Sequence, residues 1–440
     1  MIKRLIVIAI TIISSCSFAQ QGTASPYSFY GIGSLKFKGT VENRSMGGIS
    51  VYLDSIHVNL KNPASYVSKN VDAYPFDGES RPVKFTVAGT VSEVGLIGDN
   101  SDVKTNSAIF DYLALSVPLG RKLGFGFGLL PYTSVGYKID DINDDGDLIY
   151  RFNGEGGTNR VFAGFGYQLS KSLGIGVDLN YNFGTIENSA LAFEYTSEGE
   201  IVQYQTRQNT RSDVSGLNLN FGLSFKTMLN SKLELSTTAT YSPESELTSN
   251  NERSFSTLLF DSFSGSELIR NTLDDDLESQ GLKQTKVTIP SRISIGAGIG
   301  KPQKWFVGGE YTYRNTSNFS NPIFGSDISS YENSSGVAFG GFYIPNYDAF
   351  SGYFKRVVYR AGINFANTGL VIKDQSIKEF GISFGLGLPV GDRSLFSNAN
   401  LGIELGQRGT TNENLIQENF INFNVSLSLN SRWFQQRKYN

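Results

Sequence analysis

Several stretches of the chain alternate apolar residues with small or polar ones, residue by residue. The clearest runs from Leu173 to Gly184, where apolar residues occupy every odd position and glycine, aspartate or asparagine every even one. Comparable runs cover 217–225, 293–299, 380–388 and 421–429. Successive side chains of a β-strand point to opposite faces, so each run predicts a strand with one apolar face. A length of about ten residues is typical of strands that cross a membrane.

The number of such segments indicates how they are arranged. They follow one another without a change in composition that would mark a linker, and a single sheet of so many strands curls into a barrel too wide for side chains to fill. We therefore expect an all-β fold, a transmembrane antiparallel β-barrel with apolar residues facing lipid and polar residues facing a wet lumen. The predicted strands are 83–98, 108–119, 122–139, 157–170, 172–196, 201–227, 232–242, 284–300, 304–315, 354–366, 375–389, 396–408 and 416–430.

This set contains thirteen strands, whereas bacterial barrels of this kind have an even number. The prediction therefore either omits one strand of the barrel or includes one segment that is not a strand. The sequence leaves a count of 12 or 14 strands open. The region 336–343 is the best candidate for a hidden strand, which would give 14.

The N-terminus has the features of an export signal over residues 1–19. It contains two basic residues, an apolar core at 5–13 and the small residues Ser17 and Ala19 at a cleavage position. We expect cleavage after Ala19 and export to the outer membrane of a Gram-negative bacterium. Cys16 leaves a lipoprotein signal open as the alternative. No cysteine follows Ala19, so the sequence beyond it provides no disulfide framework.

Charge and hydropathy exclude two classes of protein. The chain has 38 basic and 41 acidic residues, a net charge of −3, with both signs scattered along it, which disfavours nucleic acid as a partner. After the N-terminal signal, no apolar stretch approaches the roughly 18 residues that a spanning helix needs. A chain that crosses a membrane without such helices must do so as a closed barrel.

The connections between predicted strands alternate between short and long. The short turns are expected to face the periplasm, and the long polar connections at 140–156, 243–283 and 316–352 are expected to face outward. Residues 20–82 do not alternate and are interpreted as an irregular N-terminal segment. The expected organisation is a signal at 1–19, this segment at 20–82 and a barrel at 83–440.

Motifs in the N-terminal segment are similar to those of a known family. They lie at 44–48 (Arg-Ser-Met-Gly-Gly), at Asp54 and at 62–65 (Asn-Pro-Ala-Ser), between the signal and the barrel. Their order resembles the start of FadL-type outer-membrane proteins, which transport long-chain fatty acids and aromatic hydrocarbons. The resemblance implies a 14-stranded barrel, an N-terminal hatch folded into the lumen, and a lateral opening at a kinked third strand. The third predicted strand contains Pro131, which cannot donate to a β-ladder.

Two functions are compatible with these features. The first is a channel for passive uptake of small hydrophobic molecules, such as long-chain fatty acids, with outer-membrane lipid and lipopolysaccharide around it. The second is a non-catalytic subunit of a secretion or assembly complex, which binds outer-membrane protein partners through its external loops. For the channel, the candidate ligand and gate residues are Phe29, Tyr30, Ile32, Leu35, Phe37, Asn62, Pro63, Ala64 and Pro131.

An enzymatic function is not expected. The run 381–385 matches the Gly-x-Ser-x-Gly pattern of hydrolases, but it lies inside an alternating strand rather than at a strand-to-helix turn. Ser383 is therefore interpreted as a lumen-facing strand residue. His57 is the only histidine, and it has no second histidine or cysteine with which to complete a metal site. We accordingly expect no catalytic residue, no metal site and no cofactor.

Overall fold

The computed structural model describes residues 23–67, 81–98, 102–143, 145–260, 267–324, 329–391, 397–431 and 433. The predicted signal at 1–19, including Cys16, lies outside the described residues. In the described part, no helix is long and apolar enough to cross a membrane. The single α-helix there is α2 (Val41–Arg44), and the 3-10 helices are η1 (Pro26–Phe29), η2 (Pro63–Tyr66), η3 (Thr316–Asn318), η4 (Pro322–Phe324), η5 (Tyr353–Lys355) and η6 (Asn412–Asn414).

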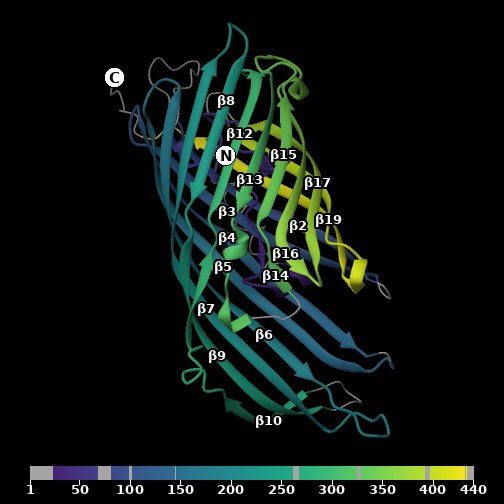
Figure 1. The fold of residues 1–440 in the computed structure, drawn as a ribbon. Helices are drawn as coiled ribbons and strands as arrows, with labels where there is room; N and C mark the ends of the chain where they lie inside the picture. The colour runs from purple at the N-terminus through teal and green to yellow at the C-terminus, as the bar shows by residue number, and fades with distance from the viewer. Residues whose placement is uncertain are drawn as a thin grey trace.

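Fourteen antiparallel strands form a closed barrel, seen from the side in Figure 1. The barrel closes where the last strand pairs with the first along its whole length, from Gln417 opposite Ile97 to Ser431 opposite Val83. The wall strands are β2 (Val83–Ile97), β3 (Asp102–Pro118), β4 (Leu123–Ile142), β5 (Leu148–Gln168), β6 (Leu173–Ala192), β7 (Tyr204–Met228), β8 (Glu234–Ser242), β12 (Arg292–Lys301), β13 (Trp305–Arg314), β15 (Ser334–Tyr343), β16 (Val358–Ile372), β17 (Gln375–Val390), β18 (Ser397–Arg408) and β19 (Gln417–Ser431).

These strands confirm the predicted fold class. Each of the thirteen predicted segments corresponds to a strand, and β15 occupies the region 336–343 in which a hidden strand was expected. The predicted segment 284–300 is divided at Pro290, which cannot donate a ladder hydrogen bond. Five further strands complete the fold, β1 (Ser34–Leu35), β9 (Ser245–Phe260), β10 (Glu267–Asp274), β11 (Gln284–Ile289) and β14 (Ser329–Tyr331).

The two faces of the wall are oriented as the alternation predicts. On β6, Ile175 and Leu179 are 38% and 50% exposed on the outside, whereas Asp178 and Asn180 are 3% and 4% exposed. The same division holds on β19, where Phe423 is exposed and Asn424 is buried. Apolar side chains therefore face outward and polar side chains face the lumen, as required of a barrel surrounded by lipid.

The extent of the three predicted external loops is wrong. Within 140–156, β4 and β5 leave only residues 143–147 as a connection. Within 243–283, most of the chain forms β9 and β10, and β9 pairs with the outer part of β7. The segment 316–352 contains β14 and β15, and its last part returns to the opposite end of the barrel, where the Ile344 amide donates to the Lys304 carbonyl. The buried face of β9 mixes leucine with serine and asparagine and its exposed face carries glutamate, so no strict apolar alternation marks this strand.

We name the two ends of the barrel by their connections. The inner end bears the short turns after β3, β5, β7 and β12, and the outer end bears the connections after β6 and β9. In Figure 1 the long strands β5, β6, β7 and β9 reach down to the outer end. The assignment of these ends to periplasm and exterior remains the prediction made from loop length.

The N-terminal segment, residues 23–67, lies within the barrel. Helix α2 begins at a Thr40 cap that accepts from the Asn43 amide, and all four of its residues are buried. The two-residue strand β1 pairs with β4 at Ser34 and Leu35. Figure 1 shows this segment in purple, surrounded by the wall.

Candidate functional site

Glycines on the lumen face allow the N-terminal segment to touch the wall. A Cβ atom on Gly340 of β15 would lie 2.2 Å from the Met46 carbonyl oxygen, and one on Gly362 of β16 would lie 2.1 Å from the Met46 carbonyl carbon. A Cβ on Gly176 of β6 would lie 2.4 Å from the Pro63 carbonyl carbon. These distances are far below van der Waals contact, so the backbone of the segment occupies space that only glycine leaves free.

Buried ion pairs also fasten the segment to the wall. The Arg44 guanidinium donates to the Asp111 carboxylate at 2.5 Å, and the Lys61 ammonium donates to the Glu310 carboxylate at 2.7 Å. Glu379 accepts from both Lys38 and a wall arginine, Arg408. Burying such charges costs desolvation energy that is recovered only when the partners stay together. The segment is therefore held at several separate places.

The single histidine forms part of a further anchor. His57 Nδ1 lies 2.6 Å from the Asp54 carboxylate, and its Nε2 lies 3.8 Å from a carboxylate oxygen of Glu42, which accepts from Asn400 of β18 at 2.7 Å. Burial lowers the pKa of His57, but the carboxylates of Asp54 and Glu42 outweigh burial and raise that pKa above its ordinary value. Burial raises the pKa of Asp54, and the adjacent imidazole outweighs it and holds that pKa below its usual range.

An aromatic pocket lies between the N-terminal segment and the outer part of the wall. Its volume is about 560 Å³. Phe29 packs edge-to-face against Tyr30, Tyr137 and Phe152, with ring centroids 5.1, 5.2 and 5.9 Å apart. Aromatic and aliphatic side chains from the connection around η3 and η4 complete it, namely Phe319, Ile323 and Phe324, together with Tyr331 of β14. We call this the outer pocket. Its size suits a small organic molecule, and its lining combines the aromatic side chains with polar ones such as Asn188, Gln208 and Thr210.

The wall is incomplete between β3 and β4. The two strands pair only from Pro118 opposite Gly124 to Leu113 opposite Leu129, and they make no further pair toward the outer end among the described residues. Directly beyond, the β4–β5 ladder shifts register between Pro131 and Thr133. The β2–β3 ladder shifts register at a comparable height, between Ala88 and Gly89, which lie opposite Tyr112 and Phe110. Both strands therefore carry an irregularity where they part, and β-bulges bend strands in this way.

The predicted site residues lie in three different places. Phe29 and Tyr30 line the outer pocket, and Ile32 belongs to the apolar cluster beside it. Leu35 pairs with Thr133, next to the irregularity at Pro131, and Phe37 packs against Tyr112. The tripeptide Asn62, Pro63 and Ala64 lies against the wall glycines, where the Asn62 side chain donates to the Leu223 carbonyl and accepts from the Ala64 amide. One pocket does not contain all of them.

The aromatic residues that the outer pocket draws from 319–331 were not among the predicted site residues. They lie in a connection without periodicity, so no alternation indicates their direction. The only available signal is the density of aromatic residues in that connection.

Ser383 takes part in packing. Its hydroxyl accepts a hydrogen bond from the Gly47 amide at 2.9 Å, and its side chain is buried on the lumen face of β17. His57, the residue that a serine hydrolase would need as its base, pairs with Asp54 and lies near Glu42. In the described part of the chain, no group of three or more histidine, cysteine, aspartate or glutamate residues is placed to hold a metal ion.

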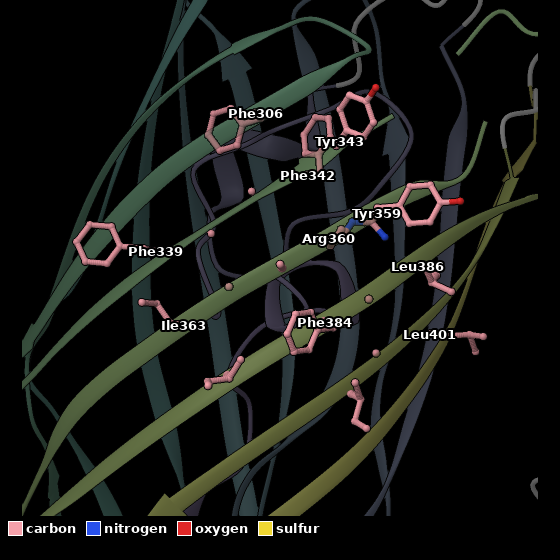
Figure 2. Close-up of a pocket in the computed structure, with 18 of the residues that line it drawn as sticks. Phe306, Phe339, Phe342, Tyr343, Tyr359, Arg360, Ile363, Phe384, Leu386 and Leu401 are labelled. Atoms are coloured by element: carbon pink, nitrogen blue, oxygen red, sulfur yellow. The ribbon is translucent and has the colours of Figure 1, made fainter. Parts of the chain in front are cut away.

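A larger concavity lies on the outside of the wall, over β13 and β15 to β19. It has a volume of about 1070 Å³ and is lined by outward apolar residues such as Phe339, Phe384 and Leu401. Figure 2 shows these side chains on the wall strands, with the purple N-terminal segment behind them. Phe339 and Phe384 are about half exposed, as expected of residues that meet lipid. This groove therefore belongs mainly to the lipid-facing surface, although the inward-facing side chains of Phe306, Phe342 and Arg360 also contribute to its lining.

Comparison with solved structures confirms the resemblance of the fold. A FadL homologue of Pseudomonas aeruginosa superimposes with a TM-score of 0.57 at 12% identity, covering 90% of this chain and 99% of that one. The toluene transporter TodX of Pseudomonas putida gives 0.55 at 16% identity, covering 90% and 99%. The CymD monoaromatic hydrocarbon channel gives 0.54 at 12% identity, covering 90% and 98%. The chain thus has the fold of FadL-type outer-membrane β-barrels.

The search of curated proteins finds no match. A family model does match, and it covers residues 1–440, the full length of the sequence. The model is that of BamG, and on this match the chain belongs to the BamG family.

Proposed function

We propose that this protein is a passive channel for small hydrophobic molecules, which enter the outer pocket and leave through the wall between β3 and β4. The observation that carries this proposal is the outer pocket itself, because an aromatic cavity formed jointly by the N-terminal segment and the wall is suited to bind an apolar solute. Proteins of the same fold include a toluene transporter and a monoaromatic hydrocarbon channel, which supports the proposal by analogy of fold.

The wall between β3 and β4 supports an exit toward lipid. A ladder that stops at Leu113 and Leu129 leaves the outer halves of both strands without mutual hydrogen bonds. Strand β1 of the N-terminal segment pairs with β4 at this place, and the Lys36 amide donates to the Tyr132 carbonyl at 3.0 Å. The segment therefore lies between the outer pocket and the gap, where a shift of β1 would connect them. In this proposal the N-terminal segment acts as a hatch.

The proposal is tested by removing an aromatic wall of the outer pocket. Phe29→Ser should lower uptake of a labelled long-chain fatty acid by cells whose outer membrane depends on this protein for that uptake. The matched control is Phe354→Ser, because Phe354 is 73% exposed and lies in the connection after β15 at the inner end. Equal uptake by Phe29→Ser and by the parent, at equal amounts of folded barrel, would contradict a route through the outer pocket.

A second function, as a subunit of an outer-membrane complex, is favoured by a different observation. All eight residues of β10 are exposed, among them Leu268, Ile269 and Leu273 at 53, 58 and 65%. Exposed apolar residues on a strand that projects beyond the bilayer are typical of a surface that binds protein. Photo-crosslinking from position 271 in native membranes would test it: a discrete adduct that Leu268→Lys abolishes supports the subunit function, and no adduct counts against it.

A further inference from the structure

The connections at the two ends of the barrel differ in charge. Those at the inner end follow β3, β5, β7, β12, β15 and β17, and they contain eight basic and two acidic residues. Those at the outer end, with the strands that they include, contain five basic and 20 acidic residues. Basic segments beside a membrane attract anionic lipid head groups. The inner end therefore presents positive charge to the leaflet that it meets.

Three of these basic residues lie on two neighbouring segments of the inner end. Lys304 precedes β13, and Lys355 and Arg356 lie near the end of the connection after β15. The Ile344 amide donates to the Lys304 carbonyl, and the Asn346 amide donates to the Lys355 carbonyl, both at 2.7 Å. These hydrogen bonds, two residues apart along the chain, join the two segments and bring their positive charges to one side of the barrel.

Carboxylates of the protein do not pair with these three basic side chains. In the described part of the chain, none of Lys304, Lys355 and Arg356 forms an ion pair with a carboxylate. Asp348 is the only acidic residue in the connection after β15, and the turn after β12 contains none. Both lysines are exposed, so their charge is available to an anion outside the protein.

An aromatic row on the lipid-facing side marks the level of the lipid head groups. Trp305, Tyr343 and Tyr359 are successive cross-strand partners on β13, β15 and β16. The Tyr359 hydroxyl donates to the Phe354 carbonyl at 3.2 Å, so the connection after β15 lies beside the outer face of the wall. Trp and Tyr gather at the membrane–water interface. The basic residues therefore lie just beyond the hydrocarbon, where head groups are found.

The groove of about 1070 Å³ on the outside of the wall begins at this aromatic row. Between Tyr343 and Phe339, the outward position of β15 is Gly341, and its partner on β16 is Ala361. In Figure 2, Tyr343 and Tyr359 lie together at the upper right and Phe339 lies at the left. Four residues of a tilted strand span about 10 Å of depth, which is most of one leaflet of a core about 30 Å thick. The groove therefore has the length of a lipid acyl chain.

We propose that this groove and the neighbouring cations bind one anionic glycerophospholipid of the leaflet at the inner end. One acyl chain lies between Tyr359 and Phe339, and the phosphate lies at Lys304, Lys355 and Arg356. Lysine and arginine donate charge-assisted hydrogen bonds to phosphate oxygens. A glycerophospholipid is favoured over lipopolysaccharide because the short turns indicate that the inner end faces the periplasm. The site lies outside the barrel and does not depend on the proposed channel function.

The first test measures how much the cations contribute to lipid binding. The protein, purified in a neutral detergent, is titrated with dioleoylphosphatidylglycerol, dioleoylphosphatidylcholine or lipid A and examined by native mass spectrometry. The charge variant combines Lys304→Gln, Lys355→Gln and Arg356→Gln. The matched control removes three exposed lysines from other turns of the inner end, by Lys122→Gln, Lys171→Gln and Lys232→Gln. Heat-dependent gel migration checks that every barrel has folded.

The second test locates the acyl chain. Phosphatidylglycerol with a diazirine in its acyl chain is added to the folded protein, and labelled peptides are identified by mass spectrometry. Ala361→Phe places a ring in the groove. Ala163→Phe is the matched control, because Ala163 is an exposed outward alanine on β5, seven strands away from β16 in the ring of fourteen.

We expect saturable binding of phosphatidylglycerol to the parent and to the lysine control, and binding about tenfold weaker or more in the charge variant. Phosphatidylcholine should bind the parent and the charge variant equally weakly. Labelling of the peptides that contain Phe339 and Phe384 should fall in Ala361→Phe and persist in Ala163→Phe.

Several results would overturn the inference. They are an absence of phosphatidylglycerol binding in the parent, equal binding in the folded charge variant, or an equal loss in the lysine control. Labelling that Ala361→Phe does not reduce would place the lipid outside the groove. Tighter binding of lipid A than of phosphatidylglycerol, lost in the charge variant, would assign the site to lipopolysaccharide and refute a phospholipid site.

Discussion

The contact between the wall glycines and Met46 gives a prediction of defined size. In Gly340→Ala, the new Cβ lies 2.2 Å from the Met46 carbonyl oxygen and 2.6 Å from its carbon, whereas ordinary contact begins at 3.4 Å. These are backbone atoms, so no side-chain rotation relieves the overlap. The turn at Met46 has to move by about 1.2 Å, which is the difference between 3.4 and 2.2 Å. Its neighbouring hydrogen bond, from the Gly47 amide to Ser383, is then stretched.

The same strand provides a matched control. A Cβ on Gly336 of β15 would lie 3.5 Å from its nearest neighbour, an ordinary contact. Overpacking of a closely packed site costs about 1 to 3 kcal/mol, and loss of the hydrogen bond adds about 1 kcal/mol. We therefore expect Gly340→Ala to lower the free energy of unfolding by about 2 to 4 kcal/mol. Gly336→Ala should change it by less than about 0.5 kcal/mol.

Urea unfolding of the detergent-solubilised barrel, followed by gel migration of the folded form, measures this difference. Limited proteolysis provides the second measurement, because a displaced N-terminal segment should be cut sooner in Gly340→Ala. Equal stability and equal protection of the two variants would show that Met46 does not lie against β15, and would refute the packing of the segment inside the barrel.

Three further predictions concern the wall, the histidine and the gap. Ile175→Asp should block assembly, measured by heat-dependent gel migration, since a charge facing lipid costs up to about 2 to 4 kcal/mol for basic residues and less for Asp. Equal sensitivity at Asn180 would mean that the lipid-facing and lumen-facing sides of the strand are the reverse of those described. Because its pKa is raised, protonated His57 stabilises the fold below about pH 6.5, and this contribution is lost as pH rises through the folded-state pKa. The melting temperature of the parent should therefore fall as pH rises, whereas that of His57→Gln should not. Pro131→Val should restore a ladder donor and reduce hydrophobic uptake while the barrel survives, and unchanged uptake would argue against a gap. Deletion of 22–65 should raise conductance in planar bilayers, and unchanged conductance would argue against a hatch.

The bilayer explains why the wall could be predicted from the sequence. Lipid on one side and water on the other impose a strict period of two, so segments such as 173–184 reveal both the strand and its facing. Strand β9 lacks this signal because its exposed face carries Glu246, Asn250 and Glu252, and all residues of β10 are exposed. The loop predicted at 243–283 is therefore mostly strand in the structure.

The candidate site could be predicted only in part. Phe29 and Tyr30 were selected as apolar residues of a segment expected to fold inward, and both line the outer pocket. Their partners Phe319 and Phe324 are far away in sequence and lie in a segment without periodicity, so only the fold brings them together.

The most direct test of the channel is to locate a bound hydrophobic molecule. A fatty acid with a photoreactive diazirine in its chain would be added to the folded protein in lipid nanodiscs, and the labelled peptides would be identified by mass spectrometry. Passage through the outer pocket predicts saturable labelling at Phe29 and in the segment 319–324, reduced by excess unlabelled fatty acid. Labelling that is confined to the lipid-facing groove around Phe339 and Phe384, and that excess fatty acid does not reduce, would contradict the account.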